Sequence, residues 1–367
     1  MRHRHNGGFR RGEGYPHRLR PVSDAGTKTR YSSDMTTRPA PDPRVIPAID
    51  AVYTAAERVR AVVAPSRLVR SDTLSEAFGI EVLFKLELEN PTGSFKVRGA
   101  YNVLASLSAE ERARGVVASS AGNHGLGVAY AAKAFDTPAT LYVPRTAPQV
   151  KKDGIRALGT TVNDDAADYD AAMIVAKAHA AREGIRFINP CLGLDLLAGQ
   201  GTVALELLEQ IPTMHTVVIC TGGGGLLGGM GAVLRALAPH VRIIGAQSVE
   251  TSAMAQSLAA GHVIDTVVTP TLADGLSGQI DADALHIGQY CADEMALVTE
   301  DELGETIAWL SRTTGMAVEG AGAVTVAALR HGHIPTVTGP MVLLVSGRNI
   351  DPSRLAAQLD RFPAQPS

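Results

Sequence analysis

The chain has little of several things that would mark a specialised class of protein. It contains only three cysteines, Cys191, Cys220 and Cys291, which are widely spaced and outside any CxxC arrangement. We therefore expect reduced thiols in a cytoplasmic protein, not a disulfide framework or a cysteine metal site. The formal net charge of −3 suggests neither a nucleic-acid nor a membrane partner. Without any run of about 18 apolar residues, no transmembrane helix is expected.

Aromatic residues are also scarce, at 4% of the 367 residues, whereas alanine, glycine and valine are abundant. This mixture is typical of α/β enzymes, and the length is enough for two domains. Residues 1–44 differ from the rest, because arginines alternate there with small residues and no hydrophobic period appears. We predict that this segment is a disordered tail outside the fold, with Met35 as an alternative start of the chain.

From Pro65 onward, strand and helix patterns alternate. Nearly continuous apolar strands, such as residues 115–120, 216–221 and 341–346, are each separated by helical patterns. This arrangement predicts parallel sheets covered by helices on both faces. Ligands of such folds bind at the carboxyl ends of strands. Four turns rich in glycine or polar residues follow predicted strands, at residues 90–95, 119–125, 221–225 and 346–349.

The first of these turns leads into Lys96. A strand pattern at residues 82–86 precedes it, and an apolar helical stripe follows it at residues 97–107, with Ser94 as the expected N-cap. Lys96 would then lie in the first turn of a helix, where the dipole and the unpaired N–H groups disfavour a cation. Such a position favours a neutral, nucleophilic amine, as Schiff-base chemistry requires. The alternative is a lysine that merely extends from the helix start into solvent.

The glycine turn at residues 221–225 predicts a phosphate cradle, because glycines let backbone N–H groups close on an anion at a helix N-terminus. A tight strand-to-helix crossing is the alternative. Gly223, Gly225 and Gly228 also match the dinucleotide pattern GxGxxG. However, Gln247 stands where that pattern expects an acidic residue at the end of the next strand. A nucleotide-binding dehydrogenase therefore remains an alternative of a different class.

The two remaining turns offer polar groups. The N–H groups of residues 119–124 could hold a carboxylate, and the Asn123 amide could donate to a phenolate oxygen. Alternatively, Ser120 or Asn123 is a plain N-cap. We interpret His124 as structural. Ser346 could pair with a neutral heterocyclic nitrogen or simply close a strand.

Taken together, these turns resemble those of fold-type II pyridoxal-phosphate enzymes, whose fold is like that of tryptophan synthase β. The closest branch is that of the threonine and serine dehydratases, which includes serine racemase. The resemblance implies a two-domain α/β enzyme and a homodimer. The large cofactor-binding domain would comprise residues 45–112 and 191–362, and a small mobile domain would comprise residues 113–190. The matching motifs are PTGSFKVRGA (91–100), SSAGNHG (119–125), AGQGTVALELLEQ (198–210), TGGGGLLGG (221–229), ADGL (273–276), VEGAGAV (318–324) and SGRNID (346–351).

The resemblance also implies a role for individual residues. Lys96 would carry pyridoxal phosphate as a Schiff base and remove the α-proton of the substrate. Phe95 would lie beside the ring, Asn123 would bond the ring hydroxyl, and Ser346 would face the ring nitrogen. The phosphate would be held by Gly222, Gly223, Gly224, Gly225 and Leu226. The substrate carboxylate would be surrounded by Ser120, Ala121, Gly122, Asn123 and His124, with Gly275 and Glu319 nearby.

The implied reaction is β-elimination of L-threonine, L-serine or both, giving a 2-oxo acid and ammonia. Another β-hydroxy amino acid is the alternative substrate, of the 3-hydroxyaspartate or hydroxyectoine-pathway type. Ala121 stands where serine racemases carry a second acid/base, which favours elimination over racemisation. Gln247 replaces the glutamate that binds a divalent metal in the racemase branch, so we expect no equivalent magnesium site.

Three further positions depart from the family pattern. Gly320 replaces a usual proline, and Asn189 stands where a His-Pro pair is common. Arg348 replaces a usual glycine after Ser346. Its side chain would either bring positive charge near the distal group of a substrate or point to solvent, and we expect solvent.

Overall fold

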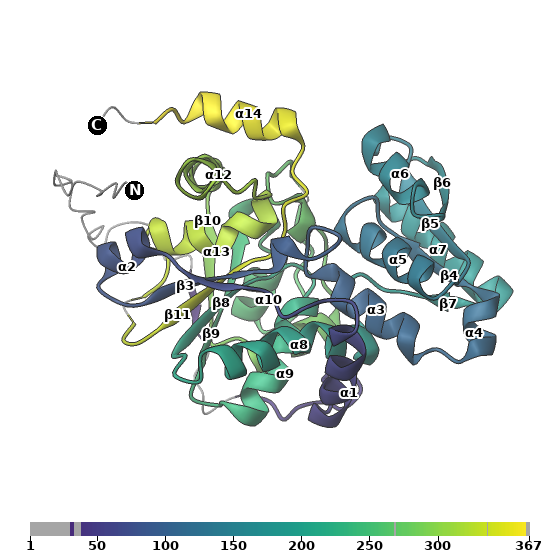
Figure 1. Ribbon diagram of the computed structural model, residues 1–367, viewed down its shortest axis with the longest axis horizontal. Coiled ribbons are helices and arrows are strands. Elements are labelled where there is room, and N and C mark those ends of the chain that lie inside the picture. The colour runs from purple at the N-terminus through teal and green to yellow at the C-terminus, as the bar shows by residue number, and fades with distance from the viewer. Residues whose placement is uncertain (1–29, 33–37, 268, 336, 365–367) are drawn as a thin grey trace, which may run out of the picture.

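The computed structural model describes residues 30–32, 38–267, 269–335 and 337–364. It contains two sheets, which lie side by side with their helices in Figure 1. The larger sheet has seven strands in the order β1-β10-β9-β8-β11-β3-β2, and the smaller has four in the order β6-β5-β4-β7. The seven strands are β1 (Arg30–Ser32), β2 (Leu68–Arg70), β3 (Val82–Leu86), β8 (Thr216–Cys220), β9 (Arg242–Ser248), β10 (Glu294–Val298) and β11 (Met341–Val345). The four are β4 (Val116–Ser119), β5 (Ala139–Pro144), β6 (Thr161–Ala166) and β7 (Arg186–Phe187).

Neighbouring strands run parallel except at the two edges of the larger sheet, where β1 and β2 pair antiparallel with β10 and β3. Parallel strands need crossover connections, and helices supply them. These helices are α1 (Ile49–Arg60), α2 (Asp72–Phe78), α3 (Lys96–Ser106), α4 (Ala109–Arg114), α5 (Asn123–Ala134), α6 (Gln149–Arg156), α7 (Tyr169–Glu183), α8 (Leu194–Gln210), α9 (Gly225–Leu237), α10 (Ala253–Ala260), α11 (Ala282–Cys291), α12 (Glu300–Thr314), α13 (Gly320–Arg330) and α14 (Pro352–Arg361). Short 3-10 turns form η2 (Glu87–Glu89), η3 (Val249–Thr251) and η4 (Asp274–Leu276).

Helices cover both faces of the larger sheet. Figure 1 shows α1, α8 and α9 on one side of it and α12, α13 and α14 on the other. The predicted class of parallel sheets covered on both faces is therefore confirmed.

Among the described residues, none of these helices combines the length and the hydrophobicity that a bilayer crossing needs. We call residues 116–187, which hold the smaller sheet, the small unit, and the other described residues the large unit.

Burial on both faces explains the near-continuous apolar strands. All residues of β3, β8 and β11 are buried, and Lys85 is buried within β3. A central strand of a doubly covered sheet has no solvent face, so even its charged residue must find partners inside the protein.

The N-terminal segment differs from its prediction. Residues 30–32 form β1, which pairs with the edge of β10. Further on, the Arg38 guanidinium lies 2.5 Å from the Asp293 carboxylate, and the Asp42 N–H donates to His286 at 3.2 Å. For these residues the expectation of a tail outside the fold is wrong, because backbone pairing to a sheet edge requires no hydrophobic period. The rest of the predicted tail, including Met35, lies outside the described residues.

Two helices begin earlier than their apolar patterns indicate. The apolar period by itself predicts helices that begin at Gly201 and Met230, whereas α8 begins at Leu194 and α9 at Gly225. Glycines hide the hydrophobic period here because they let the two helices pack closely. A side-chain carbon on Gly201 would lie 2.8 Å from the Gly229 carbonyl oxygen. The sequence IRFINP at residues 185–190 also predicts a strand, but only Arg186–Phe187 form β7.

Candidate active site

Lys96 occupies the predicted position at the start of a helix. It is the first residue of α3, is half-buried, and donates from Nζ to the Pro190 carbonyl oxygen at 2.7 Å. Nζ also lies 5.2 Å from the centre of the Phe95 ring. The amine therefore projects from the large unit toward the segment that follows β7, where the two units meet.

The predicted cap of this helix is wrong. The N-cap is Phe95, in a helical backbone conformation and without a side-chain cap, and the Ser94 hydroxyl has no partner among the described residues. Instead, the turn is held to the end of β11. Ser94 forms a β-bridge with Gly347, and the Phe95 N–H donates to the Ser346 carbonyl oxygen at 3.2 Å. Long-range backbone pairing thus replaces the local cap.

The glycine turn after β8 forms a cradle of backbone groups. The N-terminus of α9 has no side-chain cap, and within the described residues the N–H groups of residues 223–227 have no acceptor. Gly224 has a φ of +88°, which side-chain-bearing residues rarely adopt. A side-chain carbon on Gly225 would lie 2.8 Å from the Cys191 carbonyl oxygen. The turn therefore requires glycine and presents N–H donors at a helix N-terminus, as an anion site does.

The turn after β4 presents a second helix N-terminus. α5 begins at Asn123 with Gly122 as its N-cap, and no side chain caps it. The Ser120 hydroxyl accepts from the Gly122 N–H at 3.1 Å, which shapes the turn. The alternative of a plain N-cap at Ser120 or Asn123 is therefore wrong. Ala121, between them, is partly exposed.

The Asn123 amide is fixed from both sides. Its Nδ2 donates to Glu319 Oε1 at 2.6 Å, and its Oδ1 accepts from Asn349 Nδ2 at 2.6 Å. Asn349 also donates to the Thr92 carbonyl oxygen at 2.9 Å. Because Asn123 belongs to the small unit and its partners to the large unit, these bonds join the two. Asn349 lies in the polar turn at residues 346–349, and its sequence position alone indicates no role for it.

His124 is buried, and its Nε2 lies 3.1 Å from the Ile188 carbonyl oxygen. Burial, aided by the positive charge of Lys96, lowers the pKa of His124 to about 3. The ring is therefore neutral and holds the small unit to the chain after β7. This geometry agrees with the structural interpretation.

Glu319 is a buried carboxyl at the start of α13. Burial, and then the negative charge of Asp274, raise the pKa of Glu319 to about 7, although the bond from Asn123 opposes this. Gly275 lies beside it in η4, where an added side-chain carbon would be 3.1 Å from the Ala321 Cβ. At neutral pH the site thus contains a carboxyl that can hold or release a proton.

Ser346 lies at the end of β11 and is buried. Its hydroxyl donates to the Ala321 carbonyl oxygen at 3.2 Å. Cys220, at the end of the adjacent β8, is also buried, and burial raises the pKa of its thiol to about 11. The carboxyl ends of β8 and β11 therefore deliver the glycine turn and the serine to one place, as the parallel sheet requires.

Gln247 closes a turn within the protein. Its Nε2 donates to the Thr251 carbonyl oxygen at 2.6 Å, and its Oε1 accepts from the Ala255 N–H at 3.0 Å. Both ends of this buried amide are therefore occupied by backbone groups, one in η3 and one in α10.

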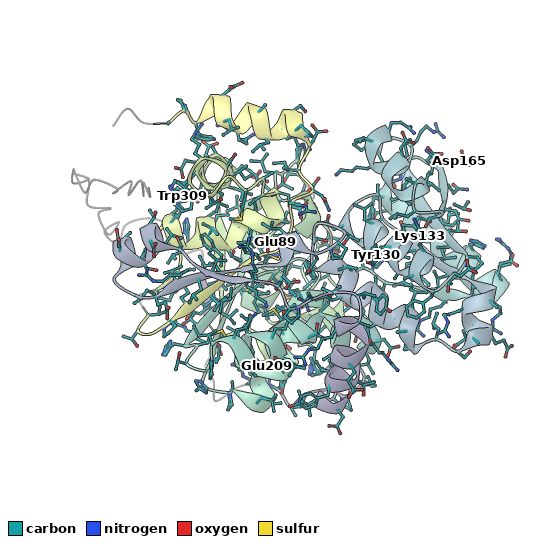
Figure 2. The ribbon with its side chains drawn as sticks, in the orientation of Figure 1. Glu89, Tyr130, Lys133, Asp165, Glu209 and Trp309 are labelled. Atoms are coloured by element: carbon teal, nitrogen blue, oxygen red, sulfur yellow. The ribbon has the colours of Figure 1, made fainter. Side chains whose placement is uncertain are left out.

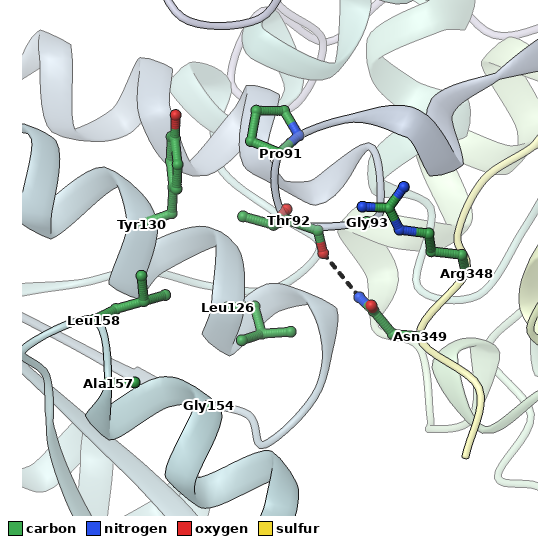
Figure 3. Close-up of a pocket in the computed structure, with 10 residues that line it drawn as sticks. All are labelled: Pro91, Thr92, Gly93, Leu126, Tyr130, Gly154, Ala157, Leu158, Arg348 and Asn349. Carbon is green, nitrogen blue, oxygen red and sulfur yellow. Dashed lines mark hydrogen bonds between the residues drawn. The ribbon is translucent and has the colours of Figure 1, made fainter. Parts of the chain in front are cut away.

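A groove of about 280 Å³ runs along the junction of the two units (Figure 3). Arg348 lines it and is exposed to solvent, in agreement with the expectation for this residue. The bond from Asn349 to the Thr92 carbonyl oxygen joins two of the residues that line it (Figure 3). The groove residues are Pro91, Thr92, Gly93, Arg348 and Asn349 of the large unit and Leu126, Tyr130, Gly154, Ala157 and Leu158 of the small unit.

Lys96, the glycine turn and Asn123 fit pyridoxal phosphate. The Lys96 amine can join the aldehyde of the cofactor, the N–H groups of the glycine turn can bind its phosphate, and the Asn123 amide can donate to its phenolate oxygen. Among the described residues, several buried polar atoms near these groups have no partner: Thr92 Oγ1, Ser94 Oγ, Ser119 Oγ and His124 Nδ1. Unsatisfied buried donors and acceptors in the turns that carry Lys96 and Asn123 call for a partner, and a bound molecule would supply one.

Comparison with known proteins supports the same conclusion. Residues 59–347 match the family of pyridoxal-phosphate dependent enzymes. The chain is 38% identical over 304 residues to the L-threonine ammonia-lyase of Thermotoga maritima, covering 83% of this chain and 76% of that one. It is 38% identical over 306 residues to a putative threonine dehydratase of Sinorhizobium fredii, covering 83% and 92%.

Solved structures agree in fold. The structure of maize serine racemase superposes with a TM-score of 0.81 at 30% identity, covering 86% of this chain and 98% of that one. The processed form of threonine deaminase isoform 2 from Solanum lycopersicum gives a TM-score of 0.80 at 30% identity, covering 89% and 100%. The chain therefore belongs to the fold-type II pyridoxal-phosphate-dependent enzymes, in the family of the threonine and serine dehydratases.

Proposed function

We propose that this enzyme is an ammonia-lyase that deaminates L-threonine, L-serine or both by β-elimination. The observation that carries the proposal is the Lys96 amine at the start of α3. Its Nζ donates to the Pro190 carbonyl oxygen, next to Cys191, which packs against the glycine turn. An added side-chain carbon on Gly127 of α5 would lie 3.1 Å from the Lys96 carbonyl oxygen. The chain's relatives among the threonine ammonia-lyases support the substrate class.

Each part of the site would have a distinct task. Lys96 would hold the cofactor covalently at rest, and its freed amine would accept the α-proton of the substrate. When bound, pyridoxal phosphate supplies an electron sink for the charge left on the substrate. The N–H groups of Gly222 to Leu226 would fix the phosphate, Phe95 would flank the ring, and Ser346 would face its nitrogen.

The turn at residues 119–125 would bind the substrate. N–H groups at the start of α5 would hold its carboxylate, with Ser120, Gly122, His124, Gly275 and Glu319 around it. Asn123 would donate to the ring hydroxyl from the orientation that Asn349 imposes. Ala121 has no group that could return a proton to the opposite face, so elimination is favoured over racemisation.

We further propose that residues 113–190 move as a mobile domain, that the enzyme is a cytoplasmic homodimer, and that it lacks the magnesium site of the racemase branch. The unpaired thiols of Cys191, Cys220 and Cys291 support a reducing compartment. The occupied amide of Gln247 supports the absence of that metal site. The alternative of a nucleotide-binding dehydrogenase is wrong, because the chain belongs to the pyridoxal-phosphate dependent enzymes.

A panel of β-hydroxy amino acids tests the proposal. Purified enzyme should absorb at about 410 nm, as a Schiff base of pyridoxal phosphate does. Reduction with borohydride should remove this absorption band. Each molecule of threonine or serine consumed should yield one molecule of 2-oxo acid and one of ammonia. If 3-hydroxyaspartate alone is turned over, the reaction type stands and the substrate is wrong. A colourless protein that binds no cofactor contradicts the whole proposal.

A further inference from the structure

The most unusual buried feature of the molecule lies behind Lys96. Four charged side chains, Lys85, Glu87, Arg98 and Glu206, are between 0% and 2% exposed and contact one another. We call them the buried charge cluster. They come from three separate elements: β3 with the adjoining η2, α3, and α8. Burying four charges is costly unless every donor and acceptor is paired, so a cluster of this kind calls for an explanation.

Arg98 is the centre of the cluster. Nε and Nη2 donate to the two oxygens of Glu87 at 2.7 and 2.9 Å. Nη1 and Nη2 donate to the two oxygens of Glu206 at 2.6 and 3.0 Å, and Nη1 also donates to the Thr202 hydroxyl at 3.1 Å. All five donors of the guanidinium are thus used, in the paired geometry that only arginine can provide.

The same cluster holds the turn on the other side of Lys96. Asn90 donates to Glu87 at 2.7 Å and to the Ser94 carbonyl oxygen at 3.4 Å. Glu87 therefore binds Arg98, two residues after Lys96, and, through Asn90, the backbone two residues before it. Residues two apart on a helix point in nearly opposite directions, so Arg98 faces the interior while Lys96 faces the site.

We propose that Arg98 is a positioning residue for Lys96, anchored by Glu87 and Glu206 so that the first turn of α3 cannot shift. The inference rests on the proposed function, because Lys96 is the reacting amine in it. Misplacement of a reacting group by about 1 Å can cost about 100-fold in rate. Anchoring of Arg98 by both Glu87 and Glu206 prevents such a shift of the helix start.

Arg98→Lys tests this, because lysine keeps the charge but lacks the planar fork of five donors that pairs with both oxygens of Glu87 and of Glu206. We expect kcat on threonine or serine to fall about 10- to 100-fold, with KM changed less than about threefold. The second measurement needs no substrate. Borohydride reduction followed by peptide mass spectrometry reports the fraction of Lys96 joined to the cofactor. We expect half-saturation to need about tenfold more pyridoxal phosphate than in the wild type.

Arg235→Lys is the matched control. Arg235 is a partly buried arginine whose side chain is 6% exposed, paired with Asp293 at 2.8 Å at the far end of α9 from the glycine turn. The same substitution there should lower the melting temperature while leaving kcat and the Lys96 titration within about twofold of wild type. Equal losses of kcat and of Lys96 occupancy in the two variants would mean that Arg98 only stabilises the fold, which overturns the proposal.

If Arg98→Lys does not fold, Thr202→Val tests whether Arg98 positions Lys96. This change keeps the side-chain shape but removes the hydroxyl that accepts from Arg98 at 3.1 Å and donates to the Gly199 carbonyl oxygen at 2.7 Å. We expect about a threefold fall in kcat and the same direction of change in the Lys96 titration. Wild-type behaviour in both measurements would refute the role of Arg98. An inactive wild type whose Lys96 still titrates with cofactor would instead refute the proposed substrate.

Discussion

The two strand-to-helix turns near Lys96 differ in the chemical groups that they present at the start of the following helix. The turn after β8 is built of four glycines, and its contacts with Cys191 and Leu276 leave no room for side chains. The turn after β4 contains Ser120, Asn123 and His124, each with a hydrogen-bonded side chain. The first can offer only its backbone, whereas the second combines backbone with adjustable polar groups.

The difference indicates what each turn binds. A cradle without side chains suits a ligand that stays, such as the phosphate of a cofactor, because nothing in it has to rearrange. A turn with polar side chains suits a ligand that comes and goes. The bonds from Asn123 to Glu319 and Asn349 also connect this turn to the large unit. The position of the small unit would thus depend on whether a ligand occupies the turn after β4, whereas the large unit would hold the cofactor.

The largest expected effect comes from removing the group between the turns. Lys96→Ala should lower turnover by more than about 10³-fold, because both the covalent link and the α-proton acceptor are lost. The variant should keep its circular dichroism spectrum, since Lys96 is only half-buried. Full turnover in this variant would refute the assignment of the reacting amine.

Gly225→Ala should break the glycine turn. The added carbon would lie 2.8 Å from the Cys191 carbonyl oxygen, so we expect about 100-fold weaker binding of pyridoxal phosphate, measured by titration. Gly154→Ala is the control, because its added carbon would meet only Leu126 at 3.8 Å. As a helix-interior glycine, Gly154 should gain about 0.5–1 kcal/mol of stability on this change. Equal cofactor affinity in all three proteins would show that the turn is not the phosphate site.

Asn123→Ala should act on the other turn. It removes an amide that donates to Glu319 and accepts from Asn349, and we expect about a tenfold fall in kcat/KM. Asn349→Ala should cause a smaller fall of the same kind, because it frees the Asn123 amide to rotate. If only Asn349→Ala has an effect, the amide of Asn123 is not the functional group.

Glu319 should make the stability of the cofactor-free protein depend on pH. Its pKa is raised from 4.5 to about 7 by burial, so between these values the folded chain keeps a proton that the unfolded chain loses. Stability should therefore fall as the pH rises through this range, by up to about 3 kcal/mol. Glu319→Gln keeps the acceptor for Asn123 and should remove this dependence in urea unfolding at pH 5 and pH 8. An unchanged slope in the variant would contradict the raised pKa.

Ala121→Ser should have the smallest effect. A hydroxyl in this turn would offer a second acid/base, so slow interconversion of the serine enantiomers should appear beside elimination. Chiral chromatography of unreacted serine measures it. Rapid interconversion by the wild type would show that the choice of elimination over racemisation is wrong.

Sequence patterns predicted the alternation of strands and helices, the position of Lys96 and the four turns. They failed where contacts are distant in sequence. The turn before α3 is held by backbone pairing with Ser346 and Gly347, about 250 residues away along the chain, and not by a Ser94 side-chain cap. The N-terminal strand β1 joins a sheet edge without any hydrophobic signal. Asn349 was visible as a polar residue in a turn, but its partner Asn123 is 226 residues away.

The sequence by itself determined which residue types follow which strands, because hydrophobic periods and glycine turns are local properties of the chain. Only the tertiary structure decided that Glu319 would be a buried carboxyl with a raised pKa and that Arg98 would meet two carboxylates behind Lys96. Both depend on burial and on partners brought together from distant segments. Desolvation and charge pairing arise only when the sheets close over them.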